Sequence, residues 1–162
     1  MTNLCYLSLG SNIGDRAAYL REAIARLSAV GTVTSISSFY ETDPVEVTEQ
    51  ARFLNCAVAL ETALAPAELM PGLLEIERSL GRERVQKKGP RTIDIDILLF
   101  GDLVVNRPDL TIPHPAMAQR RFVLAPLAEI APAAVHPVLK KTARQLLEEL
   151  PSGQNVWKFC KT

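Results

Sequence analysis

A single segment near the middle of the chain constrains the fold more than any other. A Gly-Pro pair at 89–90 and Gly101 bound a run rich in β-branched residues, which predicts a strand. Because side chains alternate along a strand, Asp94 and Asp96 share one face, with Cα atoms roughly 6.6 Å apart. The residues predicted for the opposite face are Ile93, Ile95, Ile97 and Leu99. The strand therefore pairs an apolar face for a core with a face carrying two like charges.

The aspartate pair has two interpretations. Taken alone, a D-x-D pattern indicates a solvated strand face. Against this, Asp is disfavoured in strands, and like charges on one face repel each other. A divalent cation held by both carboxylates would remove that conflict. The preceding segment 82–91 carries five positive charges against one negative charge. Cations placed beside carboxylates favour a metal and polyphosphate site.

The order of the other predicted elements gives the fold class. Strands are predicted at 4–9, 32–40 and 53–61, and apolar stripes at helical spacing predict helices before Gly31 and after Pro66. Asn12 or Asp15 is expected to cap the first helix. The order strand-helix-strand-strand-helix-strand is that of the ferredoxin-like unit. We therefore expect an α+β sandwich, mainly antiparallel, with helices packed on one face of the sheet.

Composition narrows the class of protein. The chain has 162 residues, of which 48% are hydrophobic, and this suits one domain spanning 1–162. Its 18 basic and 18 acidic residues balance, which argues against a general nucleic-acid binder. Three separated cysteines suggest neither a zinc site nor a disulfide framework. With no signal peptide and no membrane-length apolar run, we expect a cytoplasmic protein with no membrane partner.

These features together predict a chemistry before any family is considered. Mg²⁺ is held in proteins by one or two carboxylates together with substrate phosphates. Arg and Lys neutralise such phosphates, and phosphoryl-type transfer depends mainly on positioning and charge stabilisation. The residues thus predict a metal-dependent enzyme acting on a nucleotide or another polyphosphate, and they leave the second substrate open.

Several motifs resemble one family over roughly residues 4–132. They are Leu9–Arg16, Gly81-Arg82-x-Arg84, Gly89–Leu98, Pro113-His114-Pro115, Arg120 and Phe122-Val123-Leu124. In order and spacing the set resembles the 6-hydroxymethyl-7,8-dihydropterin pyrophosphokinase family of folate biosynthesis. The resemblance implies a monomeric ferredoxin-like enzyme that moves the β,γ-pyrophosphoryl group of ATP to the pterin's hydroxymethyl oxygen and releases AMP.

The resemblance also implies roles for individual residues. Asp94 and Asp96 would hold two Mg²⁺ ions, while Arg82 and Arg91 would stabilise developing charge. The implied ATP contacts are Glu77, Arg84, Lys88, Ile97, Leu110, Thr111, His114 and Arg120. The implied pterin contacts are Thr42, Asp43, Pro44, Val45, Phe53, Asn55 and Phe122, with aromatics stacking on the ring and Asn55 reading its edge. Lys87-Lys88, Asp43 and Leu74 depart from the family's usual residues.

Two other hypotheses are kept beside this one. A ferredoxin-like module that binds RNA or a regulatory metabolite would typically expose aromatics on its central strands, where this chain has aspartates. A two-metal nucleotidyltransferase would release pyrophosphate rather than AMP. The identity of a general base and the role of Trp157 in the C-terminal tail are not predicted.

Overall fold

The computed structural model describes residues 2–42, 52–81, 92–151 and 153–159. Its strands are β1 (Asn3–Ser11), β2 (Thr32–Ile36), β3 (Tyr40–Thr42), β4 (Phe53–Thr62), β5 (Asp94–Phe100), β6 (Val105–Arg107), β7 (Leu110–Ile112) and β8 (Val156–Lys158). Its α-helices are α1 (Arg16–Arg26), α2 (Pro66–Ser79), α3 (Arg121–Ile130) and α4 (Ala143–Glu149), with 3-10 turns at Leu27–Ala29 and Met117–Gln119. None of these helices combines the length and the apolarity that crossing a membrane requires.

The strands form one antiparallel sheet and a separate hairpin. The sheet runs β5-β1-β4-β3-β8, and β2 pairs with another part of β4. β6 pairs with β7 outside the sheet. This order, with β1 and β4 at the centre, is the ferredoxin-like arrangement that the sequence predicted. The single strand expected at 32–40 divides into β2 and β3, which pair with different ends of β4.

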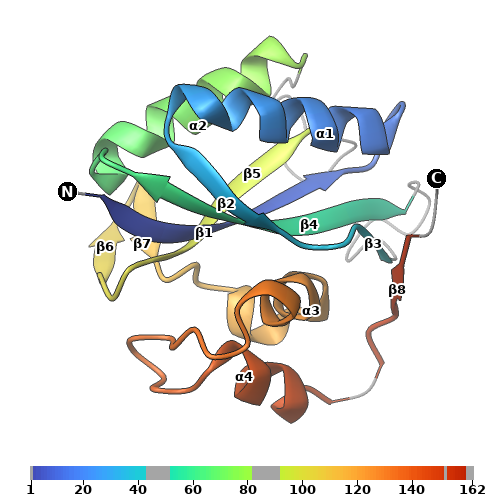
Figure 1. Cartoon of the computed structure of the whole chain (residues 1–162). Helices are drawn as coiled ribbons and strands as arrows, with labels where there is room; N and C mark the ends of the chain where they lie inside the picture. The colour runs from blue at the N-terminus through green and yellow to red at the C-terminus, as the bar shows by residue number, and fades with distance from the viewer. Residues whose placement is uncertain (1, 43–51, 82–91, 152, 160–162) are drawn as a thin grey trace.

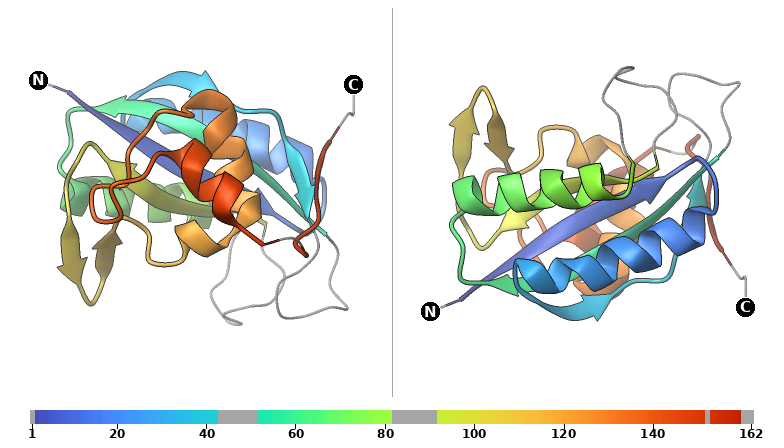
Figure 2. Two further views of the ribbon diagram at one scale, coloured as in Figure 1. Left: turned by 90° about the horizontal axis from the view of Figure 1, so that it is seen from below. Right: turned by 90° about the horizontal axis from the view of Figure 1, so that it is seen from above.

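The main core lies between the sheet and the pair α1 and α2, which cross the same face side by side (Figures 1 and 2). Asp15, one of the two caps that the sequence predicted, caps α1 by accepting a hydrogen bond from the Ala18 amide. Leu7 and Leu9 on β1 and Ile95 on β5 are buried in this core, among others. Each fully buried side chain of this size stabilises the fold by about 1.5–3 kcal/mol. A proline inside a helix commonly kinks or breaks it, but the α2 helix continues through Pro71.

The sequence predicted helices on one face of the sheet, and the structure has a second helical layer as well. Helices α3 and α4 lie on the opposite side of the sheet (Figure 1). Val123, Leu124 and Leu127 of α3 pack in a second core with Leu98 and Leu99 of β5. The prediction that Leu99 faces the same way as Ile97 is therefore wrong. β1 pairs Tyr6 with Leu99 but Leu7 with Ile97, so β5 has one extra residue at this irregularity. Such a bulge reverses the side-chain alternation beyond it, which residue spacing alone does not reveal.

One carboxylate on α3 ties this second layer to the sheet. Glu129 accepts hydrogen bonds from the Tyr40 hydroxyl at 2.6 Å and from the Ser38 amide and hydroxyl at 2.9 and 3.0 Å. Partial burial would raise the pKa of Glu129, but these hydrogen bonds and the charge of Lys158 lower it on balance. The carboxylate is thus held ionised where α3 meets β3.

Candidate active site

A row of polar and small residues crosses the sheet on the face opposite the core formed with α1 and α2. The strand register places Asp94 of β5 beside Gly10 of β1, Gly10 beside Asn55 of β4, and Asn55 beside Tyr40 of β3. Asp96 lies one step along β5, beside Ser8. Neighbours in an antiparallel register share a face, so both aspartates and Asn55 project to the same side. We call Asp94, Asp96, Gly10 and Asn55 the polar row.

Gly10 provides space in the middle of the polar row. A Cβ atom at this position would lie 2.7 Å from Asn55 Oδ1 and 3.6 Å from Phe53 Cδ1. The Asn55 amide therefore lies against the bare backbone of β1. A glycine inside a strand often marks such a close approach. Gly10 was not among the predicted site residues, and its place inside a strand is the sequence signal that could have indicated it.

Asn55 is oriented by its neighbour on β3. Its Nδ2 atom donates to Thr42 Oγ1 at 3.1 Å, and both side chains are buried. Phe53 pairs with Thr42 in the register and is half-buried. A buried amide with a fixed donor can present its oxygen in one orientation only. This end of the row can thus read the edge of a polar ring.

The aspartate end of the row is held from behind by a third carboxylate. Glu77 of α2 is only 2% exposed and accepts the Ile95 amide hydrogen bond at 2.7 Å. Ile95 lies between Asp94 and Asp96 and belongs to β5, an edge strand of the sheet. Edge strands leave amides without a partner strand, and here a helix side chain accepts that bond. The backbone between the two aspartates is therefore fixed.

His114 stands beside the aspartates as a neutral hydrogen-bond donor. Its amide donates to the Leu98 carbonyl at 3.0 Å, and its Nδ1 atom accepts the Ala116 amide at 3.1 Å. Burial lowers the pKa of His114, the positive charge of Arg120 lowers it further, and Asp94 partly opposes both. At neutral pH the ring proton thus lies on Nε2, because Nδ1 already accepts a bond.

Arg120 immediately precedes α3 and brings positive charge to the same region. Its guanidinium carbon lies 5.5 Å from the centre of the Phe122 ring, within cation–π range. Both residues are half-buried. The aspartates, His114 and Arg120 therefore combine two carboxylates able to bind a cation with two groups able to hold phosphate oxygens.

Other predicted site residues are placed less directly. The side chains of Ile97 and Leu110 are buried in the main core, while Thr111 is exposed on β7. In the structure Glu77 accepts a hydrogen bond from the Ile95 amide, and its contact with ATP stays a prediction. The remaining predicted residues lie outside the described part of the chain: Asp43, Pro44, Val45, Arg82, Arg84, Lys88 and Arg91.

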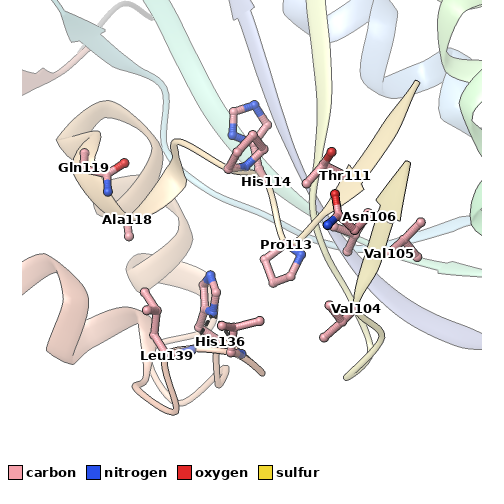
Figure 3. Close-up of a pocket in the computed structure, with 13 residues that line it drawn as sticks. Val104, Val105, Asn106, Thr111, Pro113, His114, Ala118, Gln119, His136 and Leu139 are labelled. Atoms are coloured by element: carbon pink, nitrogen blue, oxygen red, sulfur yellow. Dashed lines mark hydrogen bonds between the residues drawn. The ribbon is translucent and has the colours of Figure 1, made fainter. Parts of the chain in front are cut away.

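A cavity of about 340 Å³ adjoins the site through His114 and Thr111 (Figure 3). Val105, Asn106 and Thr111 line one side from the β6–β7 hairpin, and His136 and Leu139 line the other. His136 Nδ1 accepts the amides of Val138 and Leu139, at 3.2 and 3.1 Å, so this ring shapes its own loop. Neither aspartate lines the cavity.

The donor set of the polar row fits Mg²⁺ better than a metal that needs a full protein cage. Within the described ranges, no group of three or more His, Cys, Asp or Glu side chains could hold a metal ion. Two half-buried carboxylates on one strand face are what Mg²⁺ requires when substrate phosphates complete its coordination. A zinc-type site would need more nitrogen or sulfur ligands.

Comparison with known proteins gives a consistent set of relatives. The family model for 7,8-dihydro-6-hydroxymethylpterin-pyrophosphokinase (HPPK) matches residues 6–132. A 2-amino-4-hydroxy-6-hydroxymethyldihydropteridine pyrophosphokinase of Bacillus subtilis is 54% identical over 132 residues, 80% of this chain and 79% of the relative. A protein of the same name from Aquifex aeolicus is 40% identical, with 89% of this chain and 90% of the relative covered.

A longer relative and a solved structure extend the comparison. A folic acid synthesis protein of Dictyostelium discoideum is 40% identical over 95% of this chain, which spans 23% of that protein. A Plasmodium falciparum HPPK-DHPS crystal structure with pteroate matches with a TM-score of 0.75 and 19% identity. The match covers 92% of this chain and 42% of that one. At such low identity the structural match supports the fold alone.

The bond between Glu77 and Ile95 makes a specific prediction about stability. Glu77→Ala should lower the free energy of unfolding by about 1–3 kcal/mol, because it leaves a buried amide without its acceptor. Glu75→Ala is the matched control, since Glu75 lies on the same helix with a side chain 65% exposed, and it should cost less than about 0.5 kcal/mol. Urea unfolding followed by circular dichroism measures both. Equal losses in the two variants would contradict the role of Glu77.

Proposed function

Because the chain belongs to the 7,8-dihydro-6-hydroxymethylpterin-pyrophosphokinase family, we propose that its polar row is where the family's reaction takes place. The activity of the chain is transfer of pyrophosphate from ATP to hydroxymethyldihydropterin in folate synthesis. The observation that carries the proposal is the register that puts Asp94, Gly10 and Asn55 side by side. It supplies a phosphate end and a ring end within one row.

The reaction sets the demands on the site. The hydroxymethyl oxygen forms a bond to the β-phosphorus of ATP, the bond between that phosphorus and the α,β-bridging oxygen breaks, and AMP leaves. The hydroxyl proton is lost in the process. A hydroxyl oxygen must approach the phosphorus of an anionic triphosphate, so catalysis depends chiefly on holding the two groups in line and on neutralising charge.

At the phosphate end, Asp94 and Asp96 would hold two Mg²⁺ ions. The metal would supply charge neutralisation and a template for the displacement. The chain contributes two carboxylates on a strand whose backbone is fixed by Glu77. His114 would donate its Nε2–H to a phosphate oxygen, and Arg120 would add a full positive charge beside it.

At the ring end, Asn55, Thr42, Phe53 and Phe122 would form the pterin slot. Pterin edges carry amide-like donors and acceptors, which match the Asn55 amide held by Thr42 at 3.1 Å. Phe53 from β4 and Phe122 from α3 are half-buried aromatics available for stacking on the ring. Asp43, Pro44, Val45 and the arginines of segment 82–91 are proposed to complete the two substrate sites.

The cellular compartment is proposed from the state of the cysteines. Cys5 and Cys56 are free and buried, and burial raises the pKa of each thiol to about 12. Such thiols are unreactive core residues, as suits a reducing cytoplasm.

We take the protein to act there as a monomer, with one domain of 17.8 kDa. Light scattering during gel filtration measures that mass directly.

The test of the function is an analysis of products. The protein is incubated with ATP, Mg²⁺ and 6-hydroxymethyl-7,8-dihydropterin, and the products are separated and identified. AMP together with the pterin diphosphate is expected. ADP would indicate single phosphoryl transfer, and free pyrophosphate would indicate a nucleotidyltransferase. Either of those results, or no turnover, would overturn the assignment.

The aspartate pair gives a prediction about turnover. Asp94→Ala and Asp96→Ala should each reduce kcat on the order of a thousandfold, since the metal's several kcal/mol of charge stabilisation would be lost. Asp102→Ala is the control, because Asp102 is an exposed aspartate just after the same strand, and it should retain normal turnover. Circular dichroism confirms that the variants fold. Near-normal activity in either site variant would refute the metal assignment.

Gly10 gives a prediction about one substrate only. In Gly10→Ala the new methyl group would lie 2.7 Å from Asn55 Oδ1, so the amide must move. Losing one oriented hydrogen bond should raise the KM for the pterin about tenfold while the KM for ATP stays the same. Steady-state kinetics with each substrate varied separately measures the two constants. A matching rise in both would show that Gly10 does not act through Asn55.

A further inference from the structure

The C-terminal segment Gln154–Phe159 contacts the proposed substrate site at three places, although it lies beyond residue 132, where the family match ends. It holds β8, which runs beside β3 at the edge of the sheet (Figure 1). The sole tryptophan of the chain, Trp157, is part of this segment. Its contacts are considered one at a time.

First, β8 supports the strand that carries Thr42. β8 pairs Val156 with Thr42 and Lys158 with Tyr40, and the Phe159 amide donates to the Phe39 carbonyl at 2.7 Å. β3 has only three residues and pairs with β4 on its other side. A strand this short is weakly held by one neighbour, so pairing on both sides fixes its position. Thr42 in turn fixes the Asn55 amide.

Second, two aromatic side chains hold the start of β4 close to β3. The Arg52 guanidinium lies 4.8 Å from the Trp157 ring centre, and the Arg16 guanidinium lies 5.6 Å from the Phe159 ring centre. Arg16 also forms an ion pair with Glu41 at 2.7 Å and donates to the Arg52 carbonyl at 2.8 Å. Arg52 immediately precedes Phe53, and Glu41 immediately precedes Thr42, so these contacts join the two strands where both enter the pterin slot.

Third, the Gln154 side chain holds the segment that carries Arg120 and Phe122. Its Oε1 atom accepts the Arg121 amide at 2.7 Å, and its Nε2 atom donates to the Gln119 carbonyl at 2.9 Å. These backbone groups lie on either side of Arg120. One side chain therefore fixes the backbone from which a phosphate-binding residue and a ring-stacking residue project.

From these contacts we infer that Gln154–Phe159 is a positioning element of the enzyme, which sets the spacing between Thr42, Phe53 and Phe122 in the pterin slot. The inference rests on the proposed pterin site. None of the segment's residues needs to touch substrate. The Trp157 side chain is 43% exposed and lies outside both hydrophobic cores, so removing it changes local geometry more than core packing.

The test separates positioning from general stability by measuring the two substrates independently. Trp157→Ala should raise the KM for the pterin about two- to fivefold, as expected for loss of an exposed cation–π contact, and leave the KM for ATP unchanged. Gln154→Ala should raise both constants, because Gln154 supports both Arg120 and Phe122. Trp157→Tyr should restore most of the pterin affinity. Val135→Ala, at a residue 51% exposed in another loop and outside the cavity lining, is the control and should match the wild type.

The outcomes distinguish this inference from the proposed function. If the wild type forms no AMP and no pterin diphosphate, the proposed function fails. If the wild type is active and Trp157→Ala leaves the pterin KM unchanged, the inference is overturned. A fall in kcat that follows the unfolding midpoint, with both KM values unchanged, would likewise overturn it, since that is a purely structural effect. Should Trp157→Ala not fold, Gln154→Ala decides: a rise in both KM values supports the inference, and unchanged KM values in the folded variant overturn it.

Discussion

The hydrogen bond between the Ile95 amide and the Glu77 carboxylate, 2.7 Å long and buried, is the interaction on which the site depends. It lets an edge strand keep its outward amide satisfied without another strand beside it. It also fixes the backbone between two aspartates whose like charges would otherwise favour moving apart. The strand is thus held by β1 on one side and by a helix carboxylate on the other.

The rest of the sheet positions the residues of the proposed pterin slot in the same way. Gly10 separates the aspartates from Asn55 by one strand and leaves room for the amide. Thr42 orients the amide, β8 supports Thr42, and Gln154 supports the backbone around Arg120. In the proposed site, phosphate groups and a heterocycle would meet over neighbouring strands of one face. The second helical layer, bound through Glu129, supplies Phe122 and the start of α3 to the same face.

Sequence reasoning predicted what repeats along the chain and missed what depends on contacts between distant segments. The alternation of Asp94 and Asp96, the capping by Asp15 and the order of the elements follow from spacing and local chemistry, and the structure agrees with each. The position of Leu99 did not follow, because one extra residue in β5 reverses the alternation. The role of Gly10 appears only once Asn55 is known to lie beside it, and the contacts of Trp157 and Gln154 join residues more than thirty positions apart.

The central claim is that the two aspartates of β5 jointly hold the divalent cations that bind ATP. The most direct measurement is to count Mn²⁺ ions bound per chain by electron paramagnetic resonance, in the presence of a non-hydrolysable ATP analogue. The account predicts two ions for the wild type, and fewer for Asp94→Asn and Asp96→Asn while the fold is retained. Unchanged Mn²⁺ binding in both variants would contradict it.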